Sequence, residues 1–363
     1  MVKPVSDDQI VGDGGEVGLG DGPPESDPSS EADQAVGASL GRRRHGTGRH
    51  GTGRRGRWVV AVVVVAALAA GGLVVGLRGR ATPPATTTVP LGVYAGYTNT
   101  RGVAEVSQLL GHPLSQAMDF FDPTSWSAIV TSPTLIVPAW QGTPYQMTWG
   151  VPMLPDTGAS LATGATGAYD HYFLTVAQYL VAHGQGSSFI RLGWEFNGNW
   201  FTWSAAHCPS CFVTYWRHIV TTMRSVPGAA FRFEWNPTIG TSYLRPTDAY
   251  PGNRYVDVVA LDVYDAVRGV SGTAARWRHF LDEPYGLKWL VSFAKAHGKP
   301  IAFPEWGLWT PPEGKGDDPA FVTEMAKFIA AQPNVVSALY WDFQASTLDQ
   351  VPMSKAAFKA AFG

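Results

Sequence analysis

Two glutamates stand in matching surroundings, each just after a short apolar run and each beside a tryptophan. Glu195 follows the run Ser188–Leu192 in the segment FIRLGWEFNGNWFTW, and Glu305 lies in the segment KPIAFPEWGLW. Short apolar runs of this kind are typical of buried parallel strands. An apolar wall raises the pKa of a carboxyl group, which is what a general acid at neutral pH needs.

Such a pair at the ends of two strands of one sheet indicates glycoside hydrolysis. One carboxyl group protonates the leaving oxygen, and the other attacks the sugar or activates a water molecule. The many tryptophans suit the apolar faces of sugar rings. A single glutamate at a strand end is more often a salt-bridge partner or a helix cap, so the prediction depends on the pair.

The elements that must position this pair fit a (β/α)8 TIM barrel over residues 91–363, whose length is close to the ~250 residues typical of that fold. The eight predicted strands are Gly92–Tyr97, Gln116–Phe121, Thr134–Ala139, Ser188–Gly193, Ala230–Trp235, Val256–Val263, Pro300–Pro304 and Val336–Asp342. The helices expected between and after them are Val103–Leu110, Thr124–Ile129, Ala168–Ala182, Phe212–Ser225, Trp277–His297, Pro319–Ala331 and Ser354–Phe362. Pro284 and Gly286 interrupt the fifth of these helices, and Ser354 is a candidate N-cap for the last.

Polar and aromatic residues follow most of the predicted strands. The site of such a barrel lies at the carboxyl ends of its strands, so these residues are expected to meet at one end. They include Trp140 after the third strand, Asn236 after the fifth, Asp262 and Asp265 around the end of the sixth, and Asp342 at the end of the eighth.

The front of the chain has a different composition. Residues 1–33 carry nine acidic groups and one lysine, and residues 42–57 carry seven arginines and two histidines. We expect residues 1–57 to form a disordered tail, because they cannot bury enough apolar surface to fold. The arginine cluster suits a nucleic-acid tail or a contact with anionic lipid headgroups. The net charge of −2 gives no signal for nucleic acid over the whole chain.

Trp58–Leu77 is a run of residues without a charge, long enough as a helix to cross the ~30 Å hydrocarbon core of a membrane. The arginines before this run outnumber Arg78 and Arg80 after it, so the positive-inside rule predicts a cytoplasmic N-terminus. A cleaved signal peptide has a shorter charged leader and a shorter apolar region. We therefore expect a single-pass signal anchor over 58–77, a Thr/Pro linker over 78–90, and an extracellular barrel on the cell membrane.

The motifs at the strand ends resemble those of glycoside hydrolase family 26, which contains mostly endo-β-1,4-mannanases. The segment RLGWEFNGNWFTW resembles the acid/base segment of the family, VVALDVY its "G-x-D-x-Y" segment, and KPIAFPEWG its nucleophile segment. Asp170, with Tyr172 and Phe173, stands where the family often has "Y-D-x-Y". The resemblance covers about residues 91–350.

The resemblance implies a retaining double displacement. Glu195 is then the acid/base, and Glu305 is the nucleophile that forms a covalent glycosyl-enzyme. Retention predicts carboxyl groups ~5–5.5 Å apart, against ~6.5–9.5 Å for inversion. Tyr264 matches the tyrosine that hydrogen-bonds the nucleophile, and Arg191 matches an arginine that supports a carboxylate.

The predicted substrate-binding residues are Trp194, Asn197, Trp200, Trp235, Tyr264, Trp306 and Trp341. Trp200 matches a tryptophan that stacks at the scissile sugar. Core packing is the alternative for Trp235, Trp306 and Trp341, and a turn is the alternative for Asn197.

One residue departs from the family pattern. Trp194 stands where the family usually has a histidine directly before the acid/base. An indole N–H donates one hydrogen bond but neither accepts one nor carries a proton. This departure weakens the prediction of a mannose substrate more than it weakens the prediction of the reaction class.

The two cysteines, Cys208 and Cys211, form a single C-x-x-C motif. Redox activity and half of a zinc site are the alternatives. Thiols oxidise outside the cell, so we expect a small structural disulfide beside the site.

Together these observations predict a surface-displayed retaining hydrolase of β-linked polysaccharide, with mannan-type substrates favoured by the resemblance. We expect no cofactor, no metal and no nucleic-acid partner, and the oligomeric state stays open. The alternatives are an inactive carbohydrate-binding envelope protein and a hydrolase of a non-mannan envelope glycan.

Overall fold

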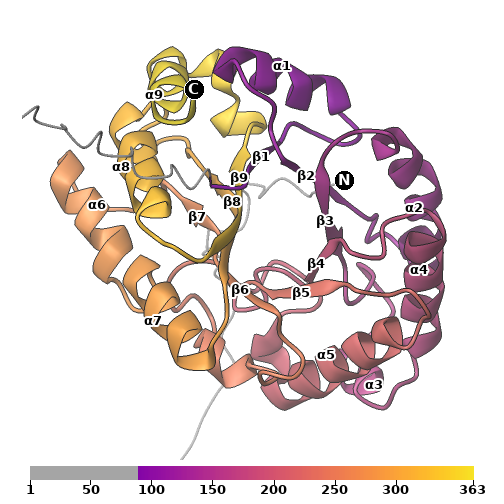
Figure 1. Ribbon diagram of the computed structural model, residues 1–363. Helices are drawn as coiled ribbons and strands as arrows, with labels where there is room; N and C mark the ends of the chain where they lie inside the picture. Colours follow the sequence, from indigo (N-terminus) through magenta and orange to yellow (C-terminus); the bar gives the residue numbers. More distant parts are fainter. Residues whose placement is uncertain (1–88) are drawn as a thin grey trace, which may run out of the picture. The chain divides into compact units, whose positions relative to one another are not determined.

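The computed structural model describes residues 89–363, which contain one parallel sheet closed into a barrel (Figure 1). The strands run in the order β6-β5-β4-β3-β2-β1-β9-β8-β7, and a pairing of β6 with β8 closes the ring. Their bounds are β1 Leu91–Tyr94, β2 Gln116–Phe120, β3 Gln146–Val151, β4 Phe189–Leu192, β5 Arg232–Trp235, β6 Val258–Ala260, β7 Val263–Tyr264, β8 Ile301–Gly307 and β9 Val335–Trp341.

The nine strands fill eight positions of the barrel. Strands β6 and β7 are consecutive pieces of one path, and both pair in parallel with β8. The break between them falls at Leu261 and Asp262, inside the predicted strand Val256–Val263. The predicted (β/α)8 barrel is thereby confirmed.

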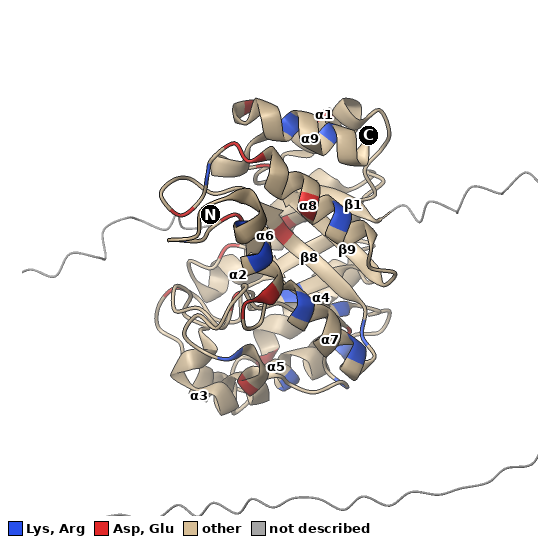
Figure 2. Ribbon diagram, turned by 90° about the vertical axis from the view of Figure 1, so that its left-hand side faces the viewer, with Lys and Arg blue, Asp and Glu red and all other residues tan. Residues whose placement is uncertain are grey.

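Helices surround the strands on the outside of the barrel, as Figure 1 shows. Their bounds are α1 Thr100–Leu110, α2 Trp126–Trp140, α3 Leu161–Gly164, α4 Asp170–Ala182, α5 Pro209–Arg224, α6 Thr273–Asp282, α7 Leu287–His297, α8 Pro319–Ala330 and α9 Pro352–Phe362. The predicted interruption of the long helical region is confirmed, because α6 ends at Asp282 and α7 begins at Leu287. Acidic and basic residues are interspersed over the face in Figure 2.

The third predicted strand was wrong. Thr134–Ala139 lies inside α2, which runs from Trp126 to Trp140 and contains Pro133 and Pro138. The true third strand is β3, Gln146–Val151, which pairs with β2 and β4. The apolar, β-branched residues of this run suit a buried strand, but they lie on α2, one side of which packs into the core through Ile129, Ile136 and Val137.

Trp140 therefore does not follow a strand. It ends α2, and its indole Nε1 donates to Oδ2 of Asp119 at 2.9 Å. Asp119 lies in β2 and also accepts the backbone N–H of Thr98. Burial raises the pKa of Asp119 to about 6, against the lowering effect of these donors.

Ser354 is not the N-cap of the last helix. Helix α9 begins at Pro352, and the carboxylate of Asp317 accepts the backbone N–H groups of Met353 at 2.9 Å and Ser354 at 2.7 Å. The neighbouring Asp318 caps α8 from its own N-terminus. The adjacent residues Asp317 and Asp318 therefore supply acceptors to the N-termini of two different helices.

Within residues 89–363, no helix is long and apolar enough to cross a membrane. The predicted tail 1–57, the predicted span 58–77 and most of the linker 78–90 lie outside the described residues.

Candidate active site

Glu305 lies within β8 and faces the site because that strand contains an irregularity. The register pairs Phe303 with Ala338 and Trp306 with Tyr340, so three steps along β8 match two along β9. Phe303 packs on Phe328 of α8 and Trp306 packs on Phe358 of α9, so both side chains face the helices. The extra residue turns Glu305 inward, as bulges beside active sites do.

Two donors hold the carboxylate of Glu305. Arg191 of β4 donates from Nη1 to Oε1 at 2.5 Å, and the hydroxyl of Tyr264 donates to Oε2 at 2.6 Å. The side chain of Glu305 is only 8% exposed. Charge-assisted bonds of this kind are strong and fix the orientation of the carboxylate. Burial, followed by the nearby Glu305, raises the pKa of Tyr264 well above its ordinary value, so its hydroxyl keeps the proton that it donates.

Arg191 connects three strands below the site. Its Nη2 donates to Oδ2 of Asp262 and its Nε donates to Oδ1 of Asn236, while the guanidinium is completely buried. Asp262 in turn accepts the backbone N–H of Glu305 at 3.1 Å. A buried charge is tolerated only when it is paired and hydrogen-bonded, and this network meets both conditions.

Glu195 leaves the end of β4 in an unusual backbone conformation. Its φ is +50°, a left-handed value that a residue other than glycine seldom adopts. Its backbone N–H donates to the carbonyl of Asn236 at 2.8 Å, and its carboxylate accepts Nε1 of Trp200 at 2.8 Å. The turn is thereby tied to the end of β5.

The two glutamates differ in their surroundings. Burial raises the pKa of Glu195 to about 7, and the charge of Glu305 acts in the same direction, while Arg191 and Trp200 oppose both. Glu305 faces a guanidinium and a hydroxyl donor, whereas Glu195 faces an indole N–H. Carboxyl groups in unlike environments take the separate roles of acid and nucleophile.

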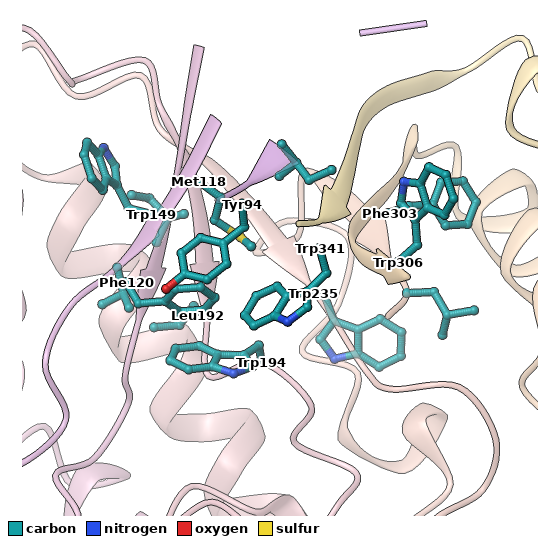
Figure 3. Close-up of a cluster of buried hydrophobic side chains, with 14 of the residues drawn as sticks. Tyr94, Met118, Phe120, Trp149, Leu192, Trp194, Trp235, Phe303, Trp306 and Trp341 are labelled. Atoms are coloured by element: carbon teal, nitrogen blue, oxygen red, sulfur yellow. The ribbon is translucent and has the colours of Figure 1, made fainter. Parts of the chain in front are cut away.

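Aromatic side chains line the end of the barrel around this pair. Trp341 stacks on Tyr94 with ring centroids 4.4 Å apart, and its ring lies 6.3 Å from that of Tyr264. Figure 3 shows Tyr94, Phe120 and Trp194 close together. Trp194 is 4% exposed and its ring lies 5.4 Å from the guanidinium of Arg191. Trp200 is 43% exposed, so it is open to a ligand.

Three predicted substrate-binding residues do not line the site. Trp235 and Trp306 are fully buried, and Trp235 packs on Phe196 and Phe293. Asn197 is also fully buried, and its amide accepts from the backbone N–H of Thr238 and donates to the carbonyl of the same residue, each at 2.9 Å. These predictions are corrected: the tryptophans belong to the core, and Asn197 joins the loops after β4 and β5.

Cys208 and Cys211 form the predicted disulfide, with Cα atoms 5.2 Å apart. It lies at the start of α5, where Cys208 precedes the first helical residue. No group of three or more histidine, cysteine, aspartate or glutamate side chains within residues 89–363 is arranged to hold a metal ion.

The sequence placed Asp262 and Asn236 at the end of the barrel without giving them a role, and it did not predict Tyr94 or Trp309 as site residues. Asp262 and Asn236 bind Arg191, Tyr94 stacks on Trp341, and Trp309 packs edge-on against Tyr264 with centroids 5.4 Å apart. The position of Asp262 and Asn236 at strand ends was the available signal. Trp309 follows Glu305 closely in the sequence, but only the fold shows which tyrosine it meets.

The fold and the site define a (β/α)8 barrel with a pair of glutamates at the carboxyl ends of β4 and β8. Comparison with known proteins agrees with this class. Residues 185–303 match the model of glycosyl hydrolase family 26, a stretch that contains Glu195 and ends just before Glu305. The resemblance inferred from the motifs is thereby supported.

Two curated relatives are similar over about half of the chain. Endoglucanase H of Acetivibrio thermocellus is 27% identical over 220 residues, which are 54% of this chain and 22% of the relative. A mannan endo-1,4-beta-mannosidase of Bifidobacterium adolescentis is 29% identical over 192 residues, which are 46% of this chain and 18% of the relative. The matches span only about a fifth of these longer proteins.

Solved structures share the fold. An endo-beta-1,4-mannanase double mutant of Cellulomonas fimi superimposes with a TM-score of 0.57 at 18% identity, covering 76% of this chain and 70% of that one. GH26C from a Muricauda species superimposes with a TM-score of 0.55 at 16% identity, covering 76% of this chain and 85% of that one.

Proposed function

We propose that the barrel is a retaining glycoside hydrolase that cleaves β-linked polysaccharide with Glu195 as acid/base and Glu305 as nucleophile. One observation carries this proposal: Glu305 is held by Arg191 and Tyr264, while Glu195, beside it, has a pKa near 7. The family match and the mannanase and endoglucanase relatives support the same reaction class.

The first step forms the glycosyl-enzyme. An Oε atom of Glu305 attacks the anomeric carbon as the glycosidic bond breaks, and Glu195 gives its proton to the leaving oxygen. Tyr264 and Arg191 orient the attacking carboxylate. In the second step Glu195, now ionised, takes a proton from water, whose oxygen displaces Glu305 from the sugar. Both glutamates return to their starting states.

The favoured substrate is a mannan-type polysaccharide, with β-glucan as the competing polymer. One relative is named a mannosidase and the other an endoglucanase. Trp194, in place of the usual histidine, packs against Arg191 and Phe120 and is almost completely buried. Exposed Trp200 beside Glu195 offers a platform for a sugar ring.

The location proposed for the enzyme is the outer face of the cell membrane. The uncharged run Trp58–Leu77, with more arginines before it than after it, supports an anchor with the barrel outside. The disulfide between Cys208 and Cys211 suits an oxidising compartment.

The deciding experiment measures hydrolysis of mannan, xylan and mixed-linkage glucan by the full-length protein, with Glu195→Gln and Glu305→Gln beside the wild type. Glu324→Gln, at an exposed ion pair on α8, is the matched control. We expect wild type and control to cleave one polymer and both site variants to lose turnover. Proton NMR of the first product should show the β-anomer.

Activity that persists in either site variant would show that the wrong glutamate was assigned. An α-anomeric first product would refute retention. Binding of a glycan without turnover by the wild type would favour the inactive carbohydrate-binding alternative.

A further inference from the structure

A buried arginine outside the network described above ties together two loops that border the nucleophile. Arg276 belongs to α6 and is 6% exposed. Its guanidinium donates to Oδ1 of Asp265 at 2.5 Å, to the carbonyl of Val267 at 3.0 Å and to the carbonyl of Glu313 at 3.2 Å. Longer contacts reach the carbonyls of Asp265 and Val270.

The first of these loops begins at the residue after Tyr264. Asp265 directly follows the tyrosine whose hydroxyl holds Glu305, and its backbone N–H donates to the carbonyl of Gly307 at 2.9 Å. A displacement of Asp265 therefore moves the end of β7, and with it the tyrosine hydroxyl.

The second loop follows β8 and carries Trp309, whose ring lies edge-on against Tyr264. Gly316 donates to the carbonyl of Trp309 at 2.9 Å, and Val267 donates to the carbonyl of Glu313 at 2.9 Å. A Cβ on Gly314 would lie 1.9 Å from the carbonyl oxygen of Trp309, so the loop folds tightly on itself. The loops thus meet at Arg276 on one side and at the Tyr264–Trp309 contact on the other.

We propose that Arg276 is a positioning residue for the nucleophile: by joining these two loops it keeps Trp309 against Tyr264 and the hydroxyl of Tyr264 on Glu305. The inference rests on the proposed hydrolase function. An arginine suits this task, because loop carbonyls turned toward one point need several donors in a planar, fixed arrangement. A lysine keeps the charge and the ion pair with Asp265 but cannot reach carbonyls of both loops in this geometry.

A double-mutant cycle distinguishes a positioning role for Arg276 from a purely structural one. A purely structural role predicts that the effects of changing Arg276 and Tyr264 on kcat are independent. The variants are Arg276→Lys, Tyr264→Phe and the double variant in the full-length protein. Removing a hydrogen bond to a charged group by Tyr264→Phe should lower kcat roughly 10- to 100-fold. If Arg276 acts through Tyr264, Arg276→Lys should lower kcat about tenfold, and the double variant should stay within about twofold of Tyr264→Phe.

The matched control is Arg224→Lys. Arg224 lies at the end of α5 and also makes an ion pair, with Asp257, and a bond to a backbone carbonyl, that of Arg254. These contacts lie before β6, away from the carboxyl ends of the strands. We expect this control to lose thermal stability as Arg276→Lys does while kcat stays unchanged. Multiplicative losses in the cycle, or an unchanged kcat in Arg276→Lys, would overturn the inference.

A second measurement does not depend on turnover. Hydrogen exchange by mass spectrometry should show faster exchange in peptides over residues 264–270 and 309–316 for Arg276→Lys, but not for Arg224→Lys. Unchanged exchange in these peptides would overturn the inference whether or not the protein cleaves a glycan. Faster exchange together with an inactive wild type would support the connection between the loops and refute the proposed hydrolase function instead.

Discussion

At the scale of single residues, the chemistry of the site depends on what each carboxyl group faces. Glu195 accepts the indole N–H of Trp200, a neutral donor, and lies near the charge of Glu305. Glu305 receives a guanidinium and a hydroxyl. The same residue type can thus serve as an acid at one strand end and as a nucleophile at another.

The pH dependence of activity should follow Glu195. With a pKa of about 7, Glu195 loses its proton above neutrality, so kcat/KM should fall on the alkaline side of pH 7. The Trp200 indole stabilises the charged form and lowers the pKa of Glu195, so Trp200→Phe should move the alkaline limb of kcat/KM to higher pH. Rate profiles between pH 4 and 10 measure the limb, with Trp277→Phe on α6 as the control. A limb that moves to lower pH, or does not move, would contradict the assignment of Glu195.

Glu234 is a buried carboxyl group that the proposed reaction does not use. It lies on β5 in register with Arg191, and neither of its oxygens has a hydrogen-bond partner within residues 89–363. Burial raises its pKa to about 7, and Arg191 and Arg232 oppose this only in part. The folded state therefore holds a proton that the unfolded chain releases near pH ~4.5.

This raised pKa predicts how stability depends on pH. The free energy of unfolding should fall as the pH rises from ~4.5 to 7. In this range the unfolded chain has released the proton of Glu234, while the folded state still holds it. Glu234→Gln cannot titrate, so between pH 5 and 8 the wild type should lose about 3 kcal/mol more than this variant. Urea unfolding at pH 5 and at pH 8 measures this difference in the free energy of unfolding. The titration of Glu195 contributes equally to the wild type and the variant, so it cancels in the comparison. Equal pH dependence in the two proteins would show that Glu234 is already ionised when folded.

At the scale of elements, the strands bring the site together, while residues far away in the sequence complete the helices. The irregularity in β8 separates Glu305 from Phe303 and Trp306, which face the helices. Helix α9 lacks a capping side chain of its own and takes its N-terminal acceptor from Asp317, ahead of α8. Caps of this kind do not appear in a local sequence pattern.

Removing this remote cap should destabilise the fold by about 1 kcal/mol. Asp317→Ala leaves the backbone N–H groups of Met353 and Ser354 without their acceptor, whereas Asp282→Ala removes only an exposed ion pair with Lys288. We expect a lower midpoint in urea for the first variant and a change within about 0.5 kcal/mol for the second. Similar losses for both would mean that the carboxylate contributes through its charge alone.

At the scale of the whole molecule, the proposed arrangement is a catalytic barrel held outside the membrane by the segment ahead of it. Under this proposal the predicted linker over 78–90 holds the barrel, whose first strand begins at Leu91, near the membrane. This position suits a polymer in or near the envelope better than a freely diffusing oligosaccharide.

Deleting residues 58–77 should release the protein from the membrane. We expect the full-length chain in the membrane fraction, resistant to carbonate extraction, and the deletion variant in the soluble fraction. Added protease should cleave the barrel on intact cells if the N-terminus is cytoplasmic. A wild type found in the soluble fraction, or a barrel protected on intact cells, would refute the anchor or its orientation. A deletion of residues 34–41, which leaves the arginine cluster and the apolar run intact, is the control.

The sequence by itself predicted the barrel, the positions of the two glutamates and the disulfide, because each depends on local pattern: short apolar runs, strand-end residues and a C-x-x-C motif. The contact of Tyr264 with Glu305 was predicted from the family resemblance. It misassigned Thr134–Ala139, because an apolar run with β-branched residues suits a strand and a buried helix face equally well.

The tertiary structure alone decided which tryptophans line the site. Trp194, Trp235, Trp306 and Trp341 all lie at strand ends, but the direction of each side chain depends on strand alternation, and the irregularity in β8 breaks that alternation. The resemblance predicted that Arg191 supports a carboxylate, but only the closed barrel shows that Arg191 pairs with both Asp262 and Glu305.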